Sequence, residues 1–111
     1  MSAVRKVYTT KSLSPQKLSL LRVMQEINYG RIENLQVRGG EPILDGHHRI
    51  VRAIKMKGES GPRPEVSSEE FALKIEVVEL FRHLRSIGNG TVKVLEVKAG
   101  LPFLMEFEEA A

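Results

Sequence analysis

The sequence predicts an α+β fold in which two pseudo-symmetric helix–β-hairpin (αββ) units pack together, with a short extra helix between them. Three observations lead to this prediction: a repeat at an offset of 60 residues, apolar residues at helical spacing, and a glycine-containing turn in each copy. At 111 residues the chain fits a single domain (1–111) with one modest core. We expect the first unit over residues 14–44, an insert over 45–66 and the second unit over 67–107.

The repeat aligns residues 20–44 with residues 80–104 without a gap. Nine of the 25 aligned positions are identical, whereas about one or two would match by chance. In the first copy these positions are Leu20, Arg22, Ile27, Gly30, Leu35, Val37, Gly40, Pro42 and Leu44. Because the match continues through the turn, it indicates two copies of a whole unit rather than two similar helices.

The first predicted helix begins after Ser14, a residue type that caps helices, with Pro15 at the first helical position. An apolar stripe at helical spacing follows, formed by Leu18, Leu21, Met24 and Ile27. Gly30 comes just after the stripe, where we expect a left-handed residue to turn the chain.

In the second copy Ser67 and Glu70 have the spacing of a capping box. The corresponding stripe consists of Phe71, Ile75, Val78, Phe81, Leu84 and Ile87. Gly90 takes the place that Gly30 has in the first copy, so we expect the two helices to end in the same way.

A hairpin is predicted after each helix, with first strands over residues 32–37 and 92–97. Gly39-Gly40 and Ala99-Gly100 are two-residue turns of a type that requires positive φ and therefore favours glycine. With such a loop Pro42 faces the first strand in a non-hydrogen-bonded pair, so its missing N–H points away from the hairpin. The second strands should therefore be outer edges. Ile32 and Leu35 differ in parity, which predicts a bulge or burial on two sides.

The insert is predicted to form a short helix, because apolar and basic residues each line one side of it. The apolar side is Ile50, Val51 and Ile54, the basic side is Arg49, Arg52 and Lys55, and Gly58 ends the helix. Asp45-Gly46-His47-His48-Arg49 would lie at its start, where backbone N–H groups favour an anion. One interpretation is a phosphate or nucleotide site formed by Gly46, His47, His48 and Arg49, in which Arg49 chelates the phosphate. In the other interpretation Asp45 caps the helix, the histidines form the turn, and Arg49 pairs with a carboxylate of the acidic half.

Composition excludes several classes of site. The chain has no cysteine, which excludes disulfides, thiolate nucleophiles and cysteine-ligated zinc. No nucleophile–base pair or acid/base carboxylate pair stands out, and we expect neither a metal nor a cofactor; Asp45, His47, His48 and His83 would form a metal site only if the fold gathered them. Residues 1–11 lack the apolar stretch of a signal peptide and no membrane span is expected, so the expected location is the cytoplasm.

Charge divides the chain into a basic and an acidic half. Residues 1–58 hold eleven Lys and Arg against four Asp and Glu, and residues 59–111 hold six against ten. The resulting +7 and −4 sum to the net charge of +3. Such halves attract each other within one fold or between subunits, or the basic half faces an anionic partner.

Two family resemblances follow from these residues. Each repeat resembles the small bacterial proteins of the YezD type, a helix followed by a glycine-turn hairpin, in the pattern carried by Leu84, Ile87, Gly90, Val92, Val97, Gly100 and Pro102. That family implies no activity. Residues 42–58 resemble the strand–turn–helix of ParB-like and sulfiredoxin-like domains, which implies phosphate contacts for Gly46 to Arg49. The sulfiredoxin activity is excluded, because it needs a cysteine in this turn.

Three hypotheses for function result. The first is a non-enzymatic binding or assembly module that forms a homodimer, based on the duplication and the charge division. The second is a ParB-like nucleotide-binding protein that uses residues 46–49. The third is a weak nucleic-acid binder that uses Arg52 and Lys55, with a shallow salt dependence because few charges are involved.

Overall fold

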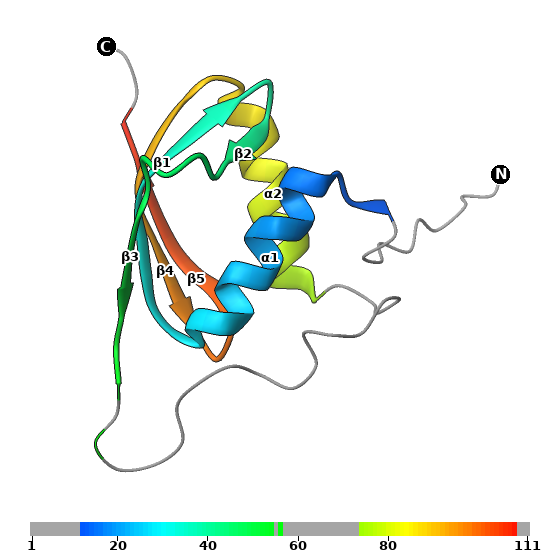
Figure 1. Cartoon of the computed structure of the whole chain (residues 1–111). Coiled ribbons are helices and arrows are strands. Elements are labelled where there is room, and N and C mark those ends of the chain that lie inside the picture. Colours follow the sequence, from blue (N-terminus) through cyan, green and yellow to red (C-terminus); the bar gives the residue numbers. More distant parts are fainter. Residues whose placement is uncertain (1–11, 55, 57–73, 109–111) are drawn as a thin grey trace, which may run out of the picture.

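The computed structural model describes residues 12–54, 56 and 74–108. This part of the chain forms an α+β fold whose elements are α1 (Pro15–Ile27), β1 (Tyr29–Arg38), β2 (Glu41–Ile43), β3 (Arg49–Arg52), α2 (Ile75–Ile87), β4 (Gly90–Lys98) and β5 (Leu101–Phe107). The five strands form one antiparallel sheet. Both helices lie on the same side of this sheet (Figure 1).

The strand order is β2-β1-β4-β5, and β3 also pairs with β1. At the centre β1 runs antiparallel to β4, with Gly30 opposite Val97 and Val37 opposite Gly90. β2 pairs with the C-terminal part of β1, and β3 pairs with its N-terminal part, where Arg52 lies opposite Gly30. One edge of the sheet is therefore the interrupted path β2–β3 and the other is β5, as the sequence predicted for the second hairpin strands.

Both predicted two-residue turns are confirmed. Gly39 and Gly40 have φ angles of 58° and 78°, and Ala99 and Gly100 have 54° and 76°. Positive φ at both central residues is the conformation that matches the twist of the flanking strands. Pro42 lies opposite Val37, as the loop length requires.

The predicted break in alternation is confirmed. Ile32 and Leu35 are both fully buried, and Asn34 between them has a φ of 61°, which changes the side to which the strand directs its side chains. The pairing of β1 with β4 keeps its register past Asn34, so this site holds no extra residue. In the pairing of β4 with β5 the register shifts between Val92 and Val94 and again between Glu96 and Val97.

The helix ends differ from the prediction. α1 is followed by Asn28, whose φ is 64° and whose N–H donates to the Met24 carbonyl at 3.0 Å. After α2, Gly88 has a φ of 72° and its N–H donates to the Leu84 carbonyl. Gly30 and Gly90 lie instead within β1 and β4, so assigning them to the helix ends was wrong. Both helices end before these glycines, and each strand begins almost directly after the capping residue, Asn28 or Gly88.

The cap of α1 is confirmed, because the Ser14 Oγ accepts the N–H of Lys17 at 3.2 Å and Pro15 is the first helical residue. α2 begins after Lys74, which makes no side-chain capping bond. The predicted capping box of Ser67 and Glu70 lies outside the described residues.

The prediction of a short extra helix was wrong for residues 49–52, because these residues form the strand β3. There Ile50 lies opposite Ile32 and Val51 opposite Arg31. The N-terminal part of β1 would otherwise leave backbone N–H and C=O groups unpaired at the sheet edge, and pairing them outweighs a weak amphipathic pattern. The β-branched residues Ile50 and Val51 also suit a strand. Lys55 and Gly58 lie outside the described residues.

The core lies between the two helices and the central strands. Its buried apolar residues are Leu20, Leu21, Met24, Ile27, Ile32, Leu35, Val37, Val77, Leu80, Phe81, Leu84, Val92, Leu95 and Val97. One backbone hydrogen bond connects each hairpin turn to the end of the other helix. The N–H of Gly40 donates to the Gly88 carbonyl at 2.8 Å, and the N–H of Gly100 donates to the Asn28 carbonyl at 2.9 Å. The two helix–hairpin segments therefore share one core.

Candidate functional site

The candidate phosphate residues lie in the loop that interrupts the edge between β2 and β3. Asp45 folds this loop on itself, because its Oδ1 accepts the N–H of His47 at 3.1 Å and its Oδ2 lies 4.0 Å from the His47 Nε2. The backbone hydrogen bond from His47 lowers the pKa of Asp45, and the nearby imidazoles of His47 and His48 lower it further. Gly46 has a φ of 97° and leaves open space where a side chain would be.

Two residues of β1 hold the far end of the loop. The Asn34 Nδ2 donates to the carbonyl of His47 at 3.1 Å, and the Arg49 Nε lies 3.7 Å from the Glu33 Oε1. Glu33 is held more closely by the Arg31 Nε at 2.6 Å, and this hydrogen bond is the main reason for its lowered pKa. Arg49 thus pairs with a carboxylate, as the second interpretation expected, although Glu33 comes from the basic half and not from the acidic one.

The loop lacks the feature on which the phosphate prediction depended. Because residues 49–52 are a strand, no helix N-terminus directs its N–H groups at residues 46–49. The Nδ1 of His48 is buried without a hydrogen-bond partner among the described residues, although the histidine itself is only half-buried. The role of Gly46, His47, His48 and Arg49 in binding phosphate stays a prediction.

The structure does not place Arg49 and Arg52, which the predicted helix had on its basic side, on one face. Arg49 and Arg52 lie three residues apart in β3, and residues of opposite parity direct their side chains to opposite faces of a strand. No group of three His, Asp or Glu in residues 12–54, 56 and 74–108 is placed to hold a metal ion. His83 is exposed on α2, and its Nε2 lies 3.8 Å from the Glu79 Oε1.

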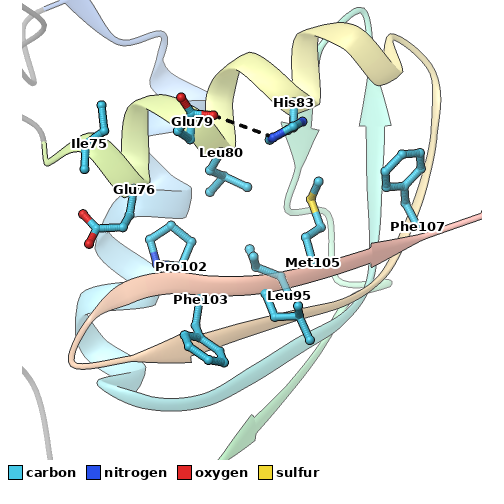
Figure 2. Close-up of a pocket in the computed structure, with 11 residues that line it drawn as sticks. Ile75, Glu76, Glu79, Leu80, His83, Leu95, Pro102, Phe103, Met105 and Phe107 are labelled. Atoms are coloured by element: carbon cyan, nitrogen blue, oxygen red, sulfur yellow. Dashed lines mark ion pairs between the residues drawn. The ribbon is translucent and has the colours of Figure 1, made fainter.

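A second candidate site lies between α2 and β5 (Figure 2). It is a groove of about 400 Å³ lined by Ile75, Glu76, Glu79, Leu80, His83, Leu95, Pro102, Phe103, Leu104, Met105 and Phe107. Leu80 and Met105 point into it from opposite sides, from α2 and from β5 (Figure 2). We call this feature the α2–β5 groove.

The groove exposes more apolar surface than a folded domain usually leaves in one place. Four large apolar side chains on its two walls remain open to solvent: Ile75 is 67% exposed, Phe103 59%, Leu104 47% and Phe107 38%. The ring of Phe103 points away from α2 (Figure 2), and the Lys98 Nζ lies 4.0 Å from its centre. Scattered exposed apolar residues need no explanation, whereas a contiguous apolar patch with a polar border is typical of an interaction site. The groove is therefore a candidate binding site.

The titratable groups of the groove are two carboxylates and one imidazole. Glu79 lies 3.8 Å from the His83 Nε2 across one turn of α2, and its other oxygen lies 3.5 Å from Arg82. Arg82 does not line the groove, and neither Lys nor Arg is among the lining residues. The border is thus acidic, and a ligand that combines apolar and basic side chains would complement it.

The outer side of β5 is an open sheet edge in the described structure, because β5 pairs with β4 alone. Pro102 and the register shift opposite Glu96 and Val97 obstruct further pairing at the start of the strand. Past the shift, residues 104–107 contain neither proline nor lysine. This half of β5 offers backbone N–H and C=O groups beside the groove.

The sequence contained a signal for the groove that our interpretation did not use. Six of the seven residues in Leu101–Phe107 are apolar, on both parities of the strand. An edge strand buries one face at most, so some of these side chains had to remain exposed. His83 adds to the signal, because the corresponding residue of α1 is the apolar Val23.

No family model, curated protein or solved structure matches the chain. None of the described helices is long and apolar enough to cross a membrane. The function has to be inferred from the groove and the loop themselves.

Proposed function

We propose that the protein is a non-enzymatic binding module whose α2–β5 groove holds an extended segment of a partner protein. The segment would add as a strand to residues 104–107 of β5 and place alternate side chains in the groove. The observation that carries this proposal is the position of an open apolar groove directly beside an open strand edge. Recognition by strand addition uses this pair of features: main-chain hydrogen bonds give affinity and pockets for alternate side chains give specificity.

Burial of the exposed groove residues supplies the driving force. Ile75 is 67% and Phe107 38% exposed, and full burial of such a side chain is worth about 1.5–3 kcal/mol. Covering half of each therefore contributes about 2 kcal/mol for the pair, before the cost of ordering the ligand. This contribution suits a reversible interaction rather than a permanent one.

The acidic border selects among apolar segments. Glu76 and Glu79 stand on the α2 side of the groove, and a basic residue between two apolar ones would lie opposite them. Because these carboxylates are solvent-exposed or partly so, they contribute to specificity and association rate more than to affinity.

The two-unit arrangement is part of the proposal. Adding 60 to Gly30 and subtracting 60 from Val97 converts their pair into Gly90 opposite Val37, which is also a pair of β1 and β4. The same operation exchanges the Gly40–Gly88 hydrogen bond with the Gly100–Asn28 bond. These relations support two pseudo-symmetric αββ units, of which the first interrupts its outer strand between β2 and β3 and the second continues its outer strand as β5.

A peptide selection tests the proposed function. A phage-displayed library of nine-residue peptides should yield ligands that combine apolar and basic residues and bind the purified protein. Phe107→Asp should weaken their binding at least tenfold, which corresponds to about 1.4 kcal/mol, because it places a charge in the groove. Ile50→Asp is the matched control: Ile50 is 46% exposed and Phe107 38%, and each is paired with a buried residue of a central strand, but Ile50 lies on the opposite edge of the sheet. A library without enrichment, or equal losses in both variants, would contradict the proposal.

A further inference from the structure

We infer that a second copy of this chain is a partner of the α2–β5 groove and that its residues 49–54, which contain β3, are the added strand. Copies would then join through opposite edges of the sheet. This inference rests on the proposed function and names a partner for the same groove. It follows from the open edge of β3, the side chains of this region, the register of the sheet and the charges of its two edges.

The β3 region lies on an edge that is open in the described structure. Among the described strands β3 pairs with β1 alone. The N–H of Ala53 donates to the Tyr29 carbonyl at 2.8 Å, so Ala53 directs its backbone groups to β1. Alternate residues of an antiparallel strand direct their N–H and C=O groups to opposite edges. Those of Ile50 and Arg52 therefore point away from β1, where another strand can pair with them.

The side chains of this region match the order that the groove requires. Ile50, Arg52 and Ile54 are all exposed, and in an extended segment they share one side. Ile50 lies opposite the buried Ile32, so this side is the one that faces the helices. It presents a basic residue between two apolar ones, which suits an apolar groove with an acidic border.

Rows of paired residues across the sheet set the register of the contact. Three rows run from β3 through β1 and β4 to β5: Ile50, Ile32, Leu95 and Met105; Arg49, Glu33, Val94 and Glu106; and Val51, Arg31, Glu96 and Leu104. A second copy placed beside β5 in the same orientation continues each row. Its Ile50 then meets Met105 on the side of the groove, and its Arg49 meets Glu106.

The strand directions allow this arrangement. β3 and β4 both run antiparallel to β1, and β5 runs antiparallel to β4. A second copy in the same orientation therefore brings its β3 antiparallel to β5 of the first copy. Both helices lie on one side of the sheet, so the helices of the two copies share one side of the joined sheet (Figure 1).

Charge favours the contact of opposite edges over the contact of like edges. Arg49 and Arg52 are exposed on β3, whereas Glu106 is exposed on β5 and Glu76 lies beside it on α2. Two β5 edges would bring these carboxylates together, and two β3 edges would bring the arginines together. β3 against β5 places Arg49 opposite Glu106, and an opposite-charge pair across two strands is favourable.

Sedimentation velocity on the full chain tests the inference. Each added copy keeps one free edge, so a head-to-tail contact continues beyond two copies. Between about 10 µM and about 500 µM the wild type should form species larger than a dimer, in amounts that rise with concentration. Ile50→Asp should weaken the association about tenfold, because it places a charge on the side that enters the groove. A wild type that stays monomeric, or that stops at a dimer, would overturn the inference.

A charge exchange tests the register with surface substitutions. Arg49→Glu and Glu106→Arg should each weaken the association about threefold, and the double variant Arg49→Glu/Glu106→Arg should restore it to within about twofold of the wild type. Arg22→Glu and Glu26→Arg are the matched controls, because they make the same changes of charge at exposed positions of α1. A double variant as weak as the single ones, or equal losses in the α1 variants, would contradict the inference.

The selected peptides separate this inference from the proposed function. In excess they should dissociate the assemblies, because they compete with β3 of the second copy for β5. Assemblies that persist at saturating peptide would show that the contact lies elsewhere. If peptides bind the groove of a protein that stays monomeric, this inference fails alone; if the library yields no groove ligand, the proposed function fails.

Discussion

The two edges of the sheet differ in the path of the outer strand and in the apolar surface that it leaves exposed. In the first unit the chain leaves the sheet after β2, forms the loop of residues 44–48 and returns as β3, and Leu44 is half-buried against the core. In the second unit β5 runs on without a loop, and Leu104, which corresponds to Leu44, is 47% exposed. The first edge is interrupted by a polar loop, whereas the second lies beside an apolar groove.

The difference amounts to three residues of chain. Ile50 lies opposite Ile32, and Phe107 lies opposite Val92. The central strand residues are 60 positions apart, whereas the edge residues are 57 apart, so the first edge path is three residues longer. A short insertion at an edge is thus enough to change what that edge offers to a ligand, because neither helix nor the central strand pair has to change.

The largest expected effect concerns the shared core. Met24 and Leu84 correspond in the two helices, and both are fully buried. Met24→Ala and Leu84→Ala should each reduce the free energy of unfolding by about 2–5 kcal/mol, since each leaves a cavity. Urea unfolding followed by circular dichroism should show one transition for each variant. Two separate transitions would mean that the units fold independently and would break the comparison.

The sequence predicted those parts of the fold that depend on local chemistry. The cap at Ser14, the turns at Gly39-Gly40 and Ala99-Gly100 and the edge position of Pro42 each follow from the conformations that these residue types allow. The strand β3 could not be predicted in this way. Ile50 and Val51 fit a short helix as well as a strand, and the decision is made by the unpaired edge of β1, which is distant in sequence.

The candidate sites show the same limit. The loop residues 45–49 were recognised by their side chains, but their chemistry depended on a helix that tertiary pairing replaced with a strand. The α2–β5 groove was missed because its parts are ordinary when seen separately. Its apolar residues match those of a core strand, and only their position on an edge leaves them exposed.

A smaller effect should separate the corresponding glycines of β1 and β4. A Cβ on Gly30 would lie 2.2 Å from the carbonyl oxygen of Val51 in β3, which is backbone and cannot move freely. Gly30→Ala should therefore cost about 1–3 kcal/mol of stability. A Cβ on Gly90 would meet the Ile87 Cγ2 at 3.3 Å, so Gly90→Ala should change stability by less than about 1 kcal/mol. Equal losses in thermal or urea unfolding would contradict the view that β3 makes the first edge different.

A still smaller effect concerns the ion pairs of the first unit. Arg31 lowers the pKa of Glu33 by a hydrogen bond, and Arg49 lowers it less. This lowered pKa stabilises the folded chain above the ordinary value of 4.5, and the contribution is lost as the pH falls through the lowered value. Carbon-13 NMR titration should show the pKa of Glu33 rising more in Arg31→Ala than in Arg49→Ala. The second unit has Lys93 at the corresponding position and should lack this pH dependence.

The smallest expected change tests the loop as a phosphate site. The pKa of Asp45 is lowered by the His47 N–H, and a phosphate held by Gly46 to Arg49 would raise it again, because a nearby negative charge favours the protonated carboxyl. If residues 46–49 bind phosphate, millimolar inorganic phosphate should raise the pKa of Asp45 in a carbon-13 NMR titration, relative to equal ionic strength of chloride. Arg49→Ala should abolish the difference. An Asp45 pKa that is the same in both salts would contradict phosphate binding by the loop and leave the α2–β5 groove as the candidate binding site.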